Sequence, residues 1–168
     1  MGRQPLPPSF ADMMLGKLAK WLRLIGADVA FSIEINDDEL MRVAEREGRM
    51  VITRDRGIIG RESDVPRFFI RHDRVGDQLR QIAGEFDLSG FEPFTRCLRC
   101  NVPINEVDKD DVRHRLWPYI YQTQNQIYEC PSCRRLYWGG THKERALKDL
   151  ARMLEEHPPQ TWKSRGVK

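Results

Sequence analysis

Apolar residues in the first 90 positions alternate between short continuous runs and spacing of helical period. The runs have the length of strands and cover residues 8–13, 28–33, 50–53 and 67–70. Helical spacing follows the first, second and fourth runs, over residues 15–25, 37–47 and 76–86. This alternation predicts an α/β fold with a small parallel sheet flanked by helices on both faces.

Acidic residues follow the predicted strands. Asp12 comes directly after the first strand, and Asp55 comes directly after the third. Asp37 and Asp38 open the helix after the second strand, and Asp77 opens the helix after the fourth. Functional groups collect beyond the carboxyl ends of parallel strands, so we expect these carboxylates to converge at one edge of the sheet. Such a set suits Mg²⁺ or Mn²⁺, which prefer oxygen ligands.

A structural role would explain several of the same acids. Asp12, Asp37 and Asp77 lie close to predicted helix starts, where an aspartate side chain caps free backbone N–H groups. No helix is predicted to begin after Asp55, and this favours a functional role for that residue. The pattern alone leaves both interpretations open for the other three.

Basic residues near these acids also have two interpretations. Lys17, Lys20 and Arg23 share one face of the first helix, which is either a solvated surface or a set of phosphate contacts. Arg54 and Arg56 stand on both sides of the acid that follows the third strand. They either orient phosphates or lie in an exposed loop.

The four cysteines occur only as two Cys-x-x-Cys pairs, Cys97 with Cys100 and Cys130 with Cys133. Thiols stay reduced in the cytosol, so paired motifs of this kind favour metal over disulfide. Two such turns complete a tetrahedral Zn²⁺ shell, whereas a redox dithiol pair and unligated cysteines are the alternatives. The 29 residues between the pairs, 101–129, exceed the spacing of a compact zinc ribbon and predict an elongated finger or an insertion.

Basic and aromatic residues border the cysteines. Arg99, Arg134 and Arg135 lie next to the thiols, and Tyr137 and Trp138 follow directly. Basic groups beside aromatic rings suit single-stranded RNA, whose bases stack on such rings. The alternative is that both aromatic side chains pack the ribbon against the rest of the protein.

These patterns divide the chain into an α/β domain (1–90), a cysteine ribbon (91–140), an amphipathic helix (141–157) and a polar tail (158–168). Residues 1–90 carry 14 Lys and Arg against 15 Asp and Glu, whereas residues 91–168 carry 14 against 10, a balance that suits a polyanion. No run approaches the roughly 18 apolar residues of a membrane span, and the start has no signal-peptide apolar region. We therefore expect a cytoplasmic protein.

Six segments occur together in one order: residues 10–26 (FADMMLGKLAKWLRLIG), 37–40 (DDEL), 48–56 (GRMVITRDR), 96–101 (RCLRCN), 130–133 (CPSC) and 137–142 (YWGGTH). In this combination the chain resembles the PIN-like ribonuclease domain first named from the C-terminal part of a mutator-seven exonuclease. The resemblance covers residues 9–145. It implies a PIN-like α/β nuclease with an appended zinc ribbon.

The resemblance also implies site residues. Asp12 and Asp55 match the acids after the first and third strands, Asp38 or alternatively Asp37 matches the helix-opening acid, and Asp77 matches the fourth. It implies hydrolysis of RNA assisted by Mg²⁺ or Mn²⁺ at these carboxylates, beside a structural Zn²⁺. Two other functions remain open: a non-catalytic RNA- or ribosome-binding module, and a toxin nuclease whose acids a partner protein masks.

Overall fold

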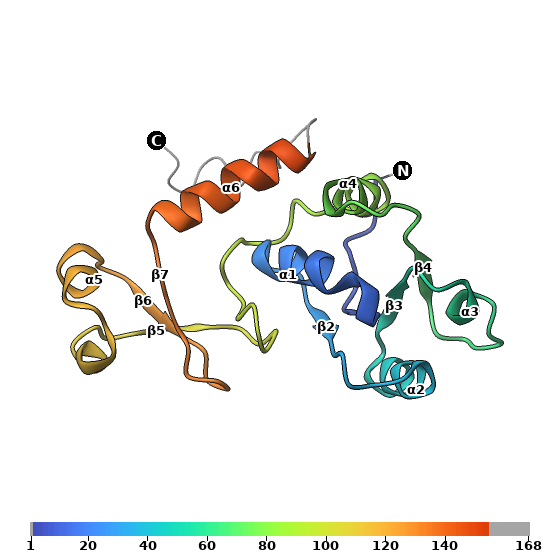
Figure 1. Cartoon of the computed structure of the whole chain (residues 1–168), viewed down its shortest axis with the longest axis horizontal. Coiled ribbons are helices and arrows are strands. Elements are labelled where there is room, and N and C mark those ends of the chain that lie inside the picture. The colour runs from blue at the N-terminus through green and yellow to red at the C-terminus, as the bar shows by residue number, and fades with distance from the viewer. Residues whose placement is uncertain (1, 155–168) are drawn as a thin grey trace.

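Four short strands form a parallel sheet in the order β2-β1-β3-β4. The computed structural model describes residues 2–154, and these strands are β1 (Ser9–Ala11), β2 (Val29–Phe31), β3 (Met50–Thr53) and β4 (Arg67–Phe69) (Figure 1). Phe10 of β1 lies opposite Ala30 of β2 and opposite Val51 of β3. The chain passes from β1 to β2 and then returns across β1 to reach β3. The direction of crossover therefore reverses between β1 and β3.

Helices cover both faces of the sheet, as the alternation of runs predicts. They are α1 (Gly16–Leu24), α2 (Asp37–Glu47), α3 (Arg56–Ile59) and α4 (Val75–Glu85). Ala11 and Ile52 enter the larger core beneath α1 and α4, whereas Phe10 and Val51 enter the smaller core against α2 and α3. Neighbouring strand residues thus point to opposite faces. The predicted parallel sheet with flanking helices is confirmed.

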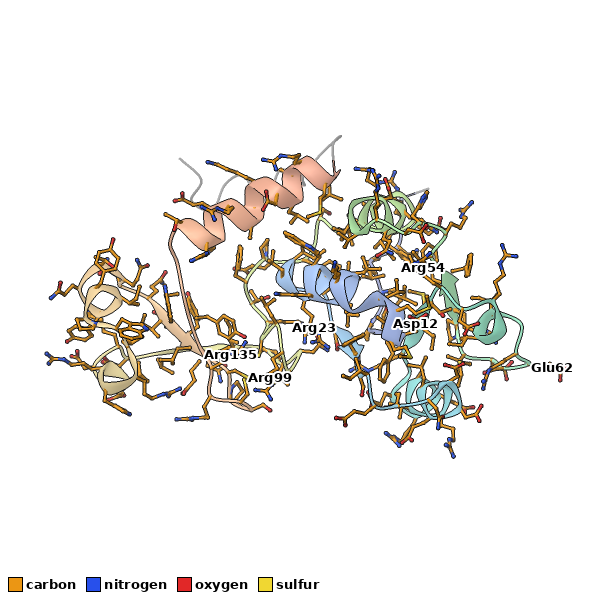
Figure 2. All side chains as sticks on the ribbon, in the orientation of Figure 1. Asp12, Arg23, Arg54, Glu62, Arg99 and Arg135 are labelled. Carbon is orange, nitrogen blue, oxygen red and sulfur yellow. The ribbon has the colours of Figure 1, made fainter. Side chains whose placement is uncertain are left out.

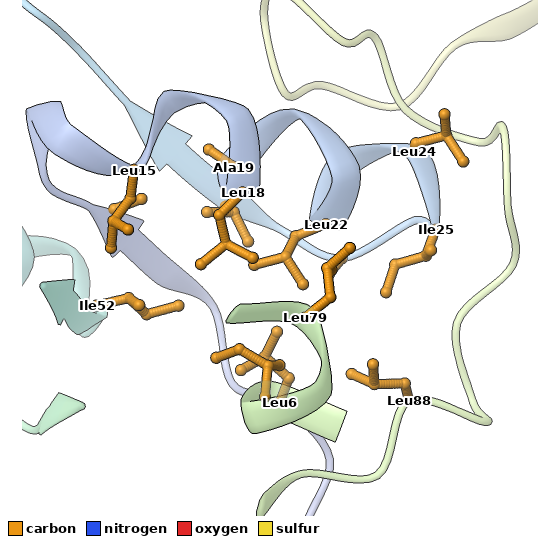
Figure 3. Close-up of a cluster of buried hydrophobic side chains, with 14 of the residues drawn as sticks. Leu6, Leu15, Leu18, Ala19, Leu22, Leu24, Ile25, Ile52, Leu79 and Leu88 are labelled. Atoms are coloured by element: carbon orange, nitrogen blue, oxygen red, sulfur yellow. The ribbon is translucent and has the colours of Figure 1, made fainter. Parts of the chain in front are cut away.

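The larger core joins segments that are far apart in the sequence. Leu18 and Leu22 of α1 are fully buried and face Leu79 of α4, and Ile52 closes the core from the sheet (Figure 3). Their spacing along α1 is the helical spacing on which the sequence prediction rests. Burial of side chains of this size stabilises the fold by about 1.5–3 kcal/mol each.

One prediction about the helices is wrong. The sequence pattern places no helix after Asp55, but α3 begins at Arg56, with Asp55 as its N-cap. The Asp55 carboxylate accepts a hydrogen bond of 2.6 Å from the Gly57 amide. A helix of four residues is too short to show a periodic pattern, so only the capping residue and its glycine neighbour mark it.

The cysteine region forms a second sheet of three antiparallel strands in the order β5-β6-β7. These strands are β5 (Asn105–Val107), β6 (Ile127–Glu129) and β7 (Leu136–Trp138). The chain between β5 and β6 contains a 3-10 turn, Arg113–Arg115, and α5 (Pro118–Thr123). An insertion between two paired strands therefore accounts for the long interval between the cysteine pairs.

The C-terminal helix α6 (Thr141–Leu154) extends from the ribbon to α4 (Figure 1). Leu150 and Leu154 are buried in the larger core, and Arg80 of α4 donates a hydrogen bond of 2.6 Å to the Met153 carbonyl. The predicted amphipathic helix is therefore docked on the protein body. Its predicted end at 157 and the polar tail lie outside the described residues. None of the helices within residues 2–154 has the length and apolar character needed to cross a membrane.

Three glycines give a graded test of the fold. Gly84 lies in α4 with open space around it, so Gly84→Ala should raise the free energy of unfolding by up to about 1 kcal/mol. Gly48 ends α2 at φ +63° in open space, and Gly48→Ala should lower the free energy of unfolding by about 1–2 kcal/mol. Gly26 has φ +99°, and an added Cβ would lie 2.3 Å from the Glu92 carbonyl oxygen. Gly26→Ala should therefore cost more than Gly48→Ala.

Urea unfolding of the three variants measures this order. An equal cost for Gly26→Ala and Gly48→Ala would contradict the close approach of the segment before the cysteines to the end of α1.

Candidate functional site

The four cysteines lie together. The Sγ atoms of Cys97, Cys100, Cys130 and Cys133 are all within 4.8 Å of one another. A tetrahedral site with Zn–S bonds of about 2.3 Å has sulfur–sulfur edges of about 3.8 Å. The Cys97 and Cys133 sulfurs are 3.7 Å apart, which matches that edge. The cluster therefore fits a closed four-thiolate Zn²⁺ site, whose role is structural.

The two cysteine turns have the same backbone pattern. In the first, the Cys100 amide points at the Cys97 sulfur (3.3 Å), and in the second the Cys133 amide points at the Cys130 sulfur (3.4 Å). The residue after each pair adopts the left-handed conformation, with φ 64° at Asn101 and φ 62° at Arg134. Both turns are therefore shaped to present two sulfurs to one ion.

Tyr137 of β7 supports the first cysteine turn. Its hydroxyl accepts a hydrogen bond from the Leu98 amide (3.2 Å) and lies 3.1 Å from the Cys97 sulfur. Burial raises the pKa of the Cys97 thiol, but hydrogen bonds from Tyr137 and from the Cys100 and Arg99 amides outweigh burial and bring that pKa to about 6. Burial, followed by the hydrogen bond with Cys133, raises the pKa of Cys100 to about 11.

The first cysteine turn is attached directly to the parallel sheet through Arg23. This side chain is buried, and its guanidinium donates to the carbonyls of Val29 (2.7 Å), Leu98 (2.9 Å) and Arg99 (3.1 Å). Burial lowers the pKa of Arg23. Arg23 is therefore neither on a solvated surface nor placed to contact phosphates, because its buried guanidinium binds backbone oxygens at the junction between the two sheets.

Asn101 makes a second attachment at the same junction. Its side-chain oxygen accepts from the Val29 amide (3.0 Å), and its side-chain nitrogen donates to Asp28 (2.6 Å). β2 is an edge strand, and this contact occupies one of its unpaired amides. Burial raises the pKa of Asp28, but hydrogen bonds from Arg49 and Asn101 reverse this and lower it. The ribbon is therefore held against the sheet by both polar and charged contacts.

Asp12 lies between the carboxyl ends of β1 and β3, where the crossover direction reverses. Only 4% of the residue is exposed. One carboxylate oxygen accepts from the Met14 amide (2.8 Å), and the other accepts from the Thr53 hydroxyl (2.5 Å) and the Arg54 amide (2.8 Å). An ionised carboxylate has about four lone-pair sites, so three donors leave room for one more partner. Crevices at such a reversal are the usual ligand sites of parallel sheets.

The acids at the helix starts surround Arg61. This guanidinium forms an ion pair with Asp38 and lies 3.9 Å from Asp37. The hydrogen bond from Arg61 lowers the pKa of Asp38. The pKa of Arg61 is raised, first by this hydrogen bond and then by the charges of Asp38, Asp37 and Asp55. Three acids of the predicted site thus share one arginine.

Asp77 lies elsewhere. It pairs with Arg80 on the next turn of α4, and Arg80 also binds the backbone of α6. Asp73 is the acid connected to the Asp12 region, because it pairs with Arg54, whose amide binds the Asp12 carboxylate. Sequence reasoning missed Asp73, although it is the first acid after the fourth predicted strand.

The described residues do not bring the carboxylates of Asp12, Asp38, Asp55 and Asp77 together as one ligand set. Within residues 2–154, the four cysteines are the only group of three or more Cys, His, Asp or Glu ligands at mutual distances of 4.8 Å or less. Like charges repel, and each carboxylate binds an amide, a hydroxyl or an arginine instead of sharing one point with the others.

The remaining basic candidates lie on the surface. Lys17 and Lys20 of α1, Arg56 of α3, and Arg99 and Arg135 of the ribbon are exposed. Arg134 is also exposed and lies 3.2 Å from the Glu129 carboxylate, and Arg54 is half-buried. In Figure 2, Arg99 and Arg135 lie on the ribbon side of Arg23, whereas Asp12 and Arg54 lie on the other.

Fold and site together define an α/β domain with an attached metal-binding ribbon of four cysteines. The family model of the Mut7-C RNAse domain matches residues 9–150, so the chain belongs to the Mut7-C RNAse domain family. This match confirms the resemblance seen in the sequence. No curated protein and no solved structure gives a significant match.

The metal centre predicts a specific loss on substitution. Cys130→Ser should lower the affinity for Zn²⁺ by more than tenfold and unfold the ribbon, since metal binding and folding are coupled in such sites. Pro131→Ala, an exposed residue of the same turn with no ligand atom, is the matched control. Metal analysis and thermal unfolding measure both effects. One full equivalent of Zn²⁺ held by Cys130→Ser at unchanged stability would contradict the four-thiolate site.

Proposed function

We propose that this protein is a metal-dependent ribonuclease of the PIN type whose Mg²⁺ or Mn²⁺ ion binds at the carboxyl edge of the parallel sheet. One observation carries the proposal: a buried carboxylate, Asp12, lies at the reversal point of the sheet and is connected through Thr53 to the backbone of Asp55. The ribonuclease class comes from membership of the Mut7-C RNAse domain family. Mg²⁺ sites commonly need only one or two carboxylates together with substrate phosphates, so a preformed set of four is not required.

Asp12 is the principal ligand in this proposal because its environment fixes its orientation. Thr53 connects the two acids: its hydroxyl donates to the Asp12 carboxylate and accepts from the Asp55 amide (2.9 Å). Asp55 and Asp38, or Asp37, complete the acidic edge, and Asp73 replaces Asp77 as the fourth acid. A metal ion bound here would polarise the scissile phosphate and lower the pKa of a bound water.

RNA is the proposed partner, and exposed basic residues would bind its phosphates. Lys17 and Lys20 lie one helix beyond Asp12, and Arg54 and Arg56 stand on both sides of Asp55. Contacts of this kind supply affinity without sequence preference and weaken as the salt concentration rises. The exposed arginines of the ribbon would supply further phosphate contacts away from the acidic edge.

A non-catalytic RNA-binding module is the second candidate. The observation that favours it is that Asp12 and Asp55 both cap helical turns, which explains their presence without chemistry. In that case the basic ribbon would carry the function.

Substitution of the two acids separates these candidates. Asp12→Asn and Asp55→Asn should each lower the rate of Mn²⁺-dependent cleavage of single-stranded RNA by about 100-fold or more, because even the loss of groups that only orient metal ligands costs about 10- to 100-fold. Asp64→Asn, an exposed acid before β4, should keep the wild-type rate. Cleavage that persists in both variants would remove the enzyme proposal, and RNA binding without cleavage by the wild type would favour the module.

Arg61 gives a prediction about metal affinity. It neutralises Asp38, Asp37 and Asp55, so Arg61→Ala should leave the acidic edge more negative and tighten Mn²⁺ binding severalfold. Arg46→Ala, which removes an exposed arginine from α2, is the control. Electron paramagnetic resonance titration of the zinc-loaded protein with Mn²⁺ measures the affinity. Weaker Mn²⁺ binding in Arg61→Ala would show that Arg61 organises the acids rather than competing for them.

A further inference from the structure

A cavity of about 190 Å³ lies where three segments meet: the chain before the first cysteine turn, the ribbon sheet and the start of α6. Its aromatic lining consists of Phe94, Tyr128, Tyr137 and Trp138, and its charged lining consists of two cations, Arg96 and Lys143, and one acid, Glu92. Sites for drug-sized ligands measure about 300–1,000 Å³, so this cavity suits a single aromatic ring system. No part of the acidic edge contributes to it.

We propose that this cavity binds one nucleobase of single-stranded RNA, with the Lys143 ammonium at the adjoining phosphate. The proposal rests on the proposed function in taking RNA as the ligand, but it does not depend on cleavage. Every base has a flat π-face, so aromatic side chains hold single strands by stacking, and a neighbouring cation binds the backbone.

Phe94 and Lys143 form the most distinctive part of the wall. The Lys143 ammonium lies 4.9 Å from the centre of the Phe94 ring. Phe94 has φ 63°, a left-handed conformation that a bulky residue adopts only where its surroundings fix it, and such residues concentrate at ligand sites. The Phe94 ring and the Lys143 ammonium are therefore placed to contact the same nucleotide, the ring at its base and the ammonium at its phosphate.

Hydrogen bonds hold two other residues of the cavity wall. Tyr137 is held by its hydrogen bonds to the first cysteine turn, and Arg96 donates to the carbonyls of Gly26 (3.0 Å) and Asn101 (2.6 Å). Trp138 is 38% exposed, so part of its ring is open to solvent. The cavity thus has rigid walls and one accessible aromatic ring.

A second aromatic surface on the ribbon provides the control. Trp117 and Tyr119 in the insertion are 77% and 70% exposed. Neither of them lines the aromatic cavity. A base stacked there would be covered on one face only, whereas the cavity walls would surround a base on several sides. Trp117→Ala therefore tests stacking outside the cavity, and Lys148→Ala removes one exposed charge from the same helix as Lys143.

The test measures binding of a fluorescein-labelled ten-nucleotide single-stranded RNA by anisotropy, at constant salt. The zinc-loaded full chain is used without added Mg²⁺ or Mn²⁺. Trp138→Ala should weaken binding about fivefold or more, within the range for loss of one stacked base, and Lys143→Ala should weaken it about as much through loss of one phosphate contact. Trp117→Ala and Lys148→Ala should stay within about twofold of wild type. Thermal unfolding and zinc content check that each variant is folded.

Two results would overturn the proposal. One is wild-type affinity in folded Lys143→Ala, and the other is a loss confined to Trp117→Ala, which would place stacking on the insertion. Asp64→Asn, which changes an exposed acid outside both proposed sites, should bind the RNA as wild type does. Binding that is unaffected by the cavity variants would remove only this inference, whereas wild-type protein that binds no RNA would also remove the RNA partner of the proposed function.

Discussion

The carboxylate of Asp12 is the constraint on which the candidate site depends. It connects the ends of β1 and β3, because its oxygens accept hydrogen bonds from the Met14 amide after β1, from the Thr53 hydroxyl in β3 and from the Arg54 amide after β3. The sheet order makes this connection possible, since β1 and β3 are neighbours whose crossovers leave in opposite directions. A charged group at this point is both a structural cap and the feature best placed to meet a ligand. In the proposed function, the ligand would use a lone pair of the carboxylate that the cap leaves free.

The ribbon and the parallel sheet depend on each other through a second set of contacts. Arg23 and Asn101 connect the backbone of the first cysteine turn to α1 and β2. The backbone of that turn is folded around the sulfurs, so a change in metal occupancy would alter the surface that meets the sheet. The helix α6 closes the same unit by packing against α4. The aromatic cavity lies between these elements and depends on all of them.

Much of the fold could be predicted from the sequence, because buried parallel strands and amphipathic helices leave strong periodic patterns. The β3 run and the apolar face of α1 are examples. The strands of the ribbon could not be predicted in the same way: β5 is mostly exposed and polar, so it leaves no continuous apolar run. The metal site could be predicted from cysteine spacing alone, since the chemistry of the ligands fixes that spacing.

The candidate acidic site could be predicted only in part. The rule for carboxyl ends of strands located Asp12 and Asp55, but it does not say which way a side chain points. Asp77 pairs within its own helix, and Asp73 is the acid connected to Asp12. The role of Arg23 depends on contacts to residues about 75 positions away, and no local pattern reports contacts over such a separation.

The central claim is that Asp12 holds a divalent ion, and crystals of the zinc-loaded protein soaked in MnCl₂ test it most directly. Anomalous scattering measured at the manganese edge should give a peak in bonding contact with the Asp12 carboxylate and next to Asp55, separate from the zinc peak at the four cysteines. A map with a zinc peak at the cysteines and no manganese peak at Asp12 would contradict the account.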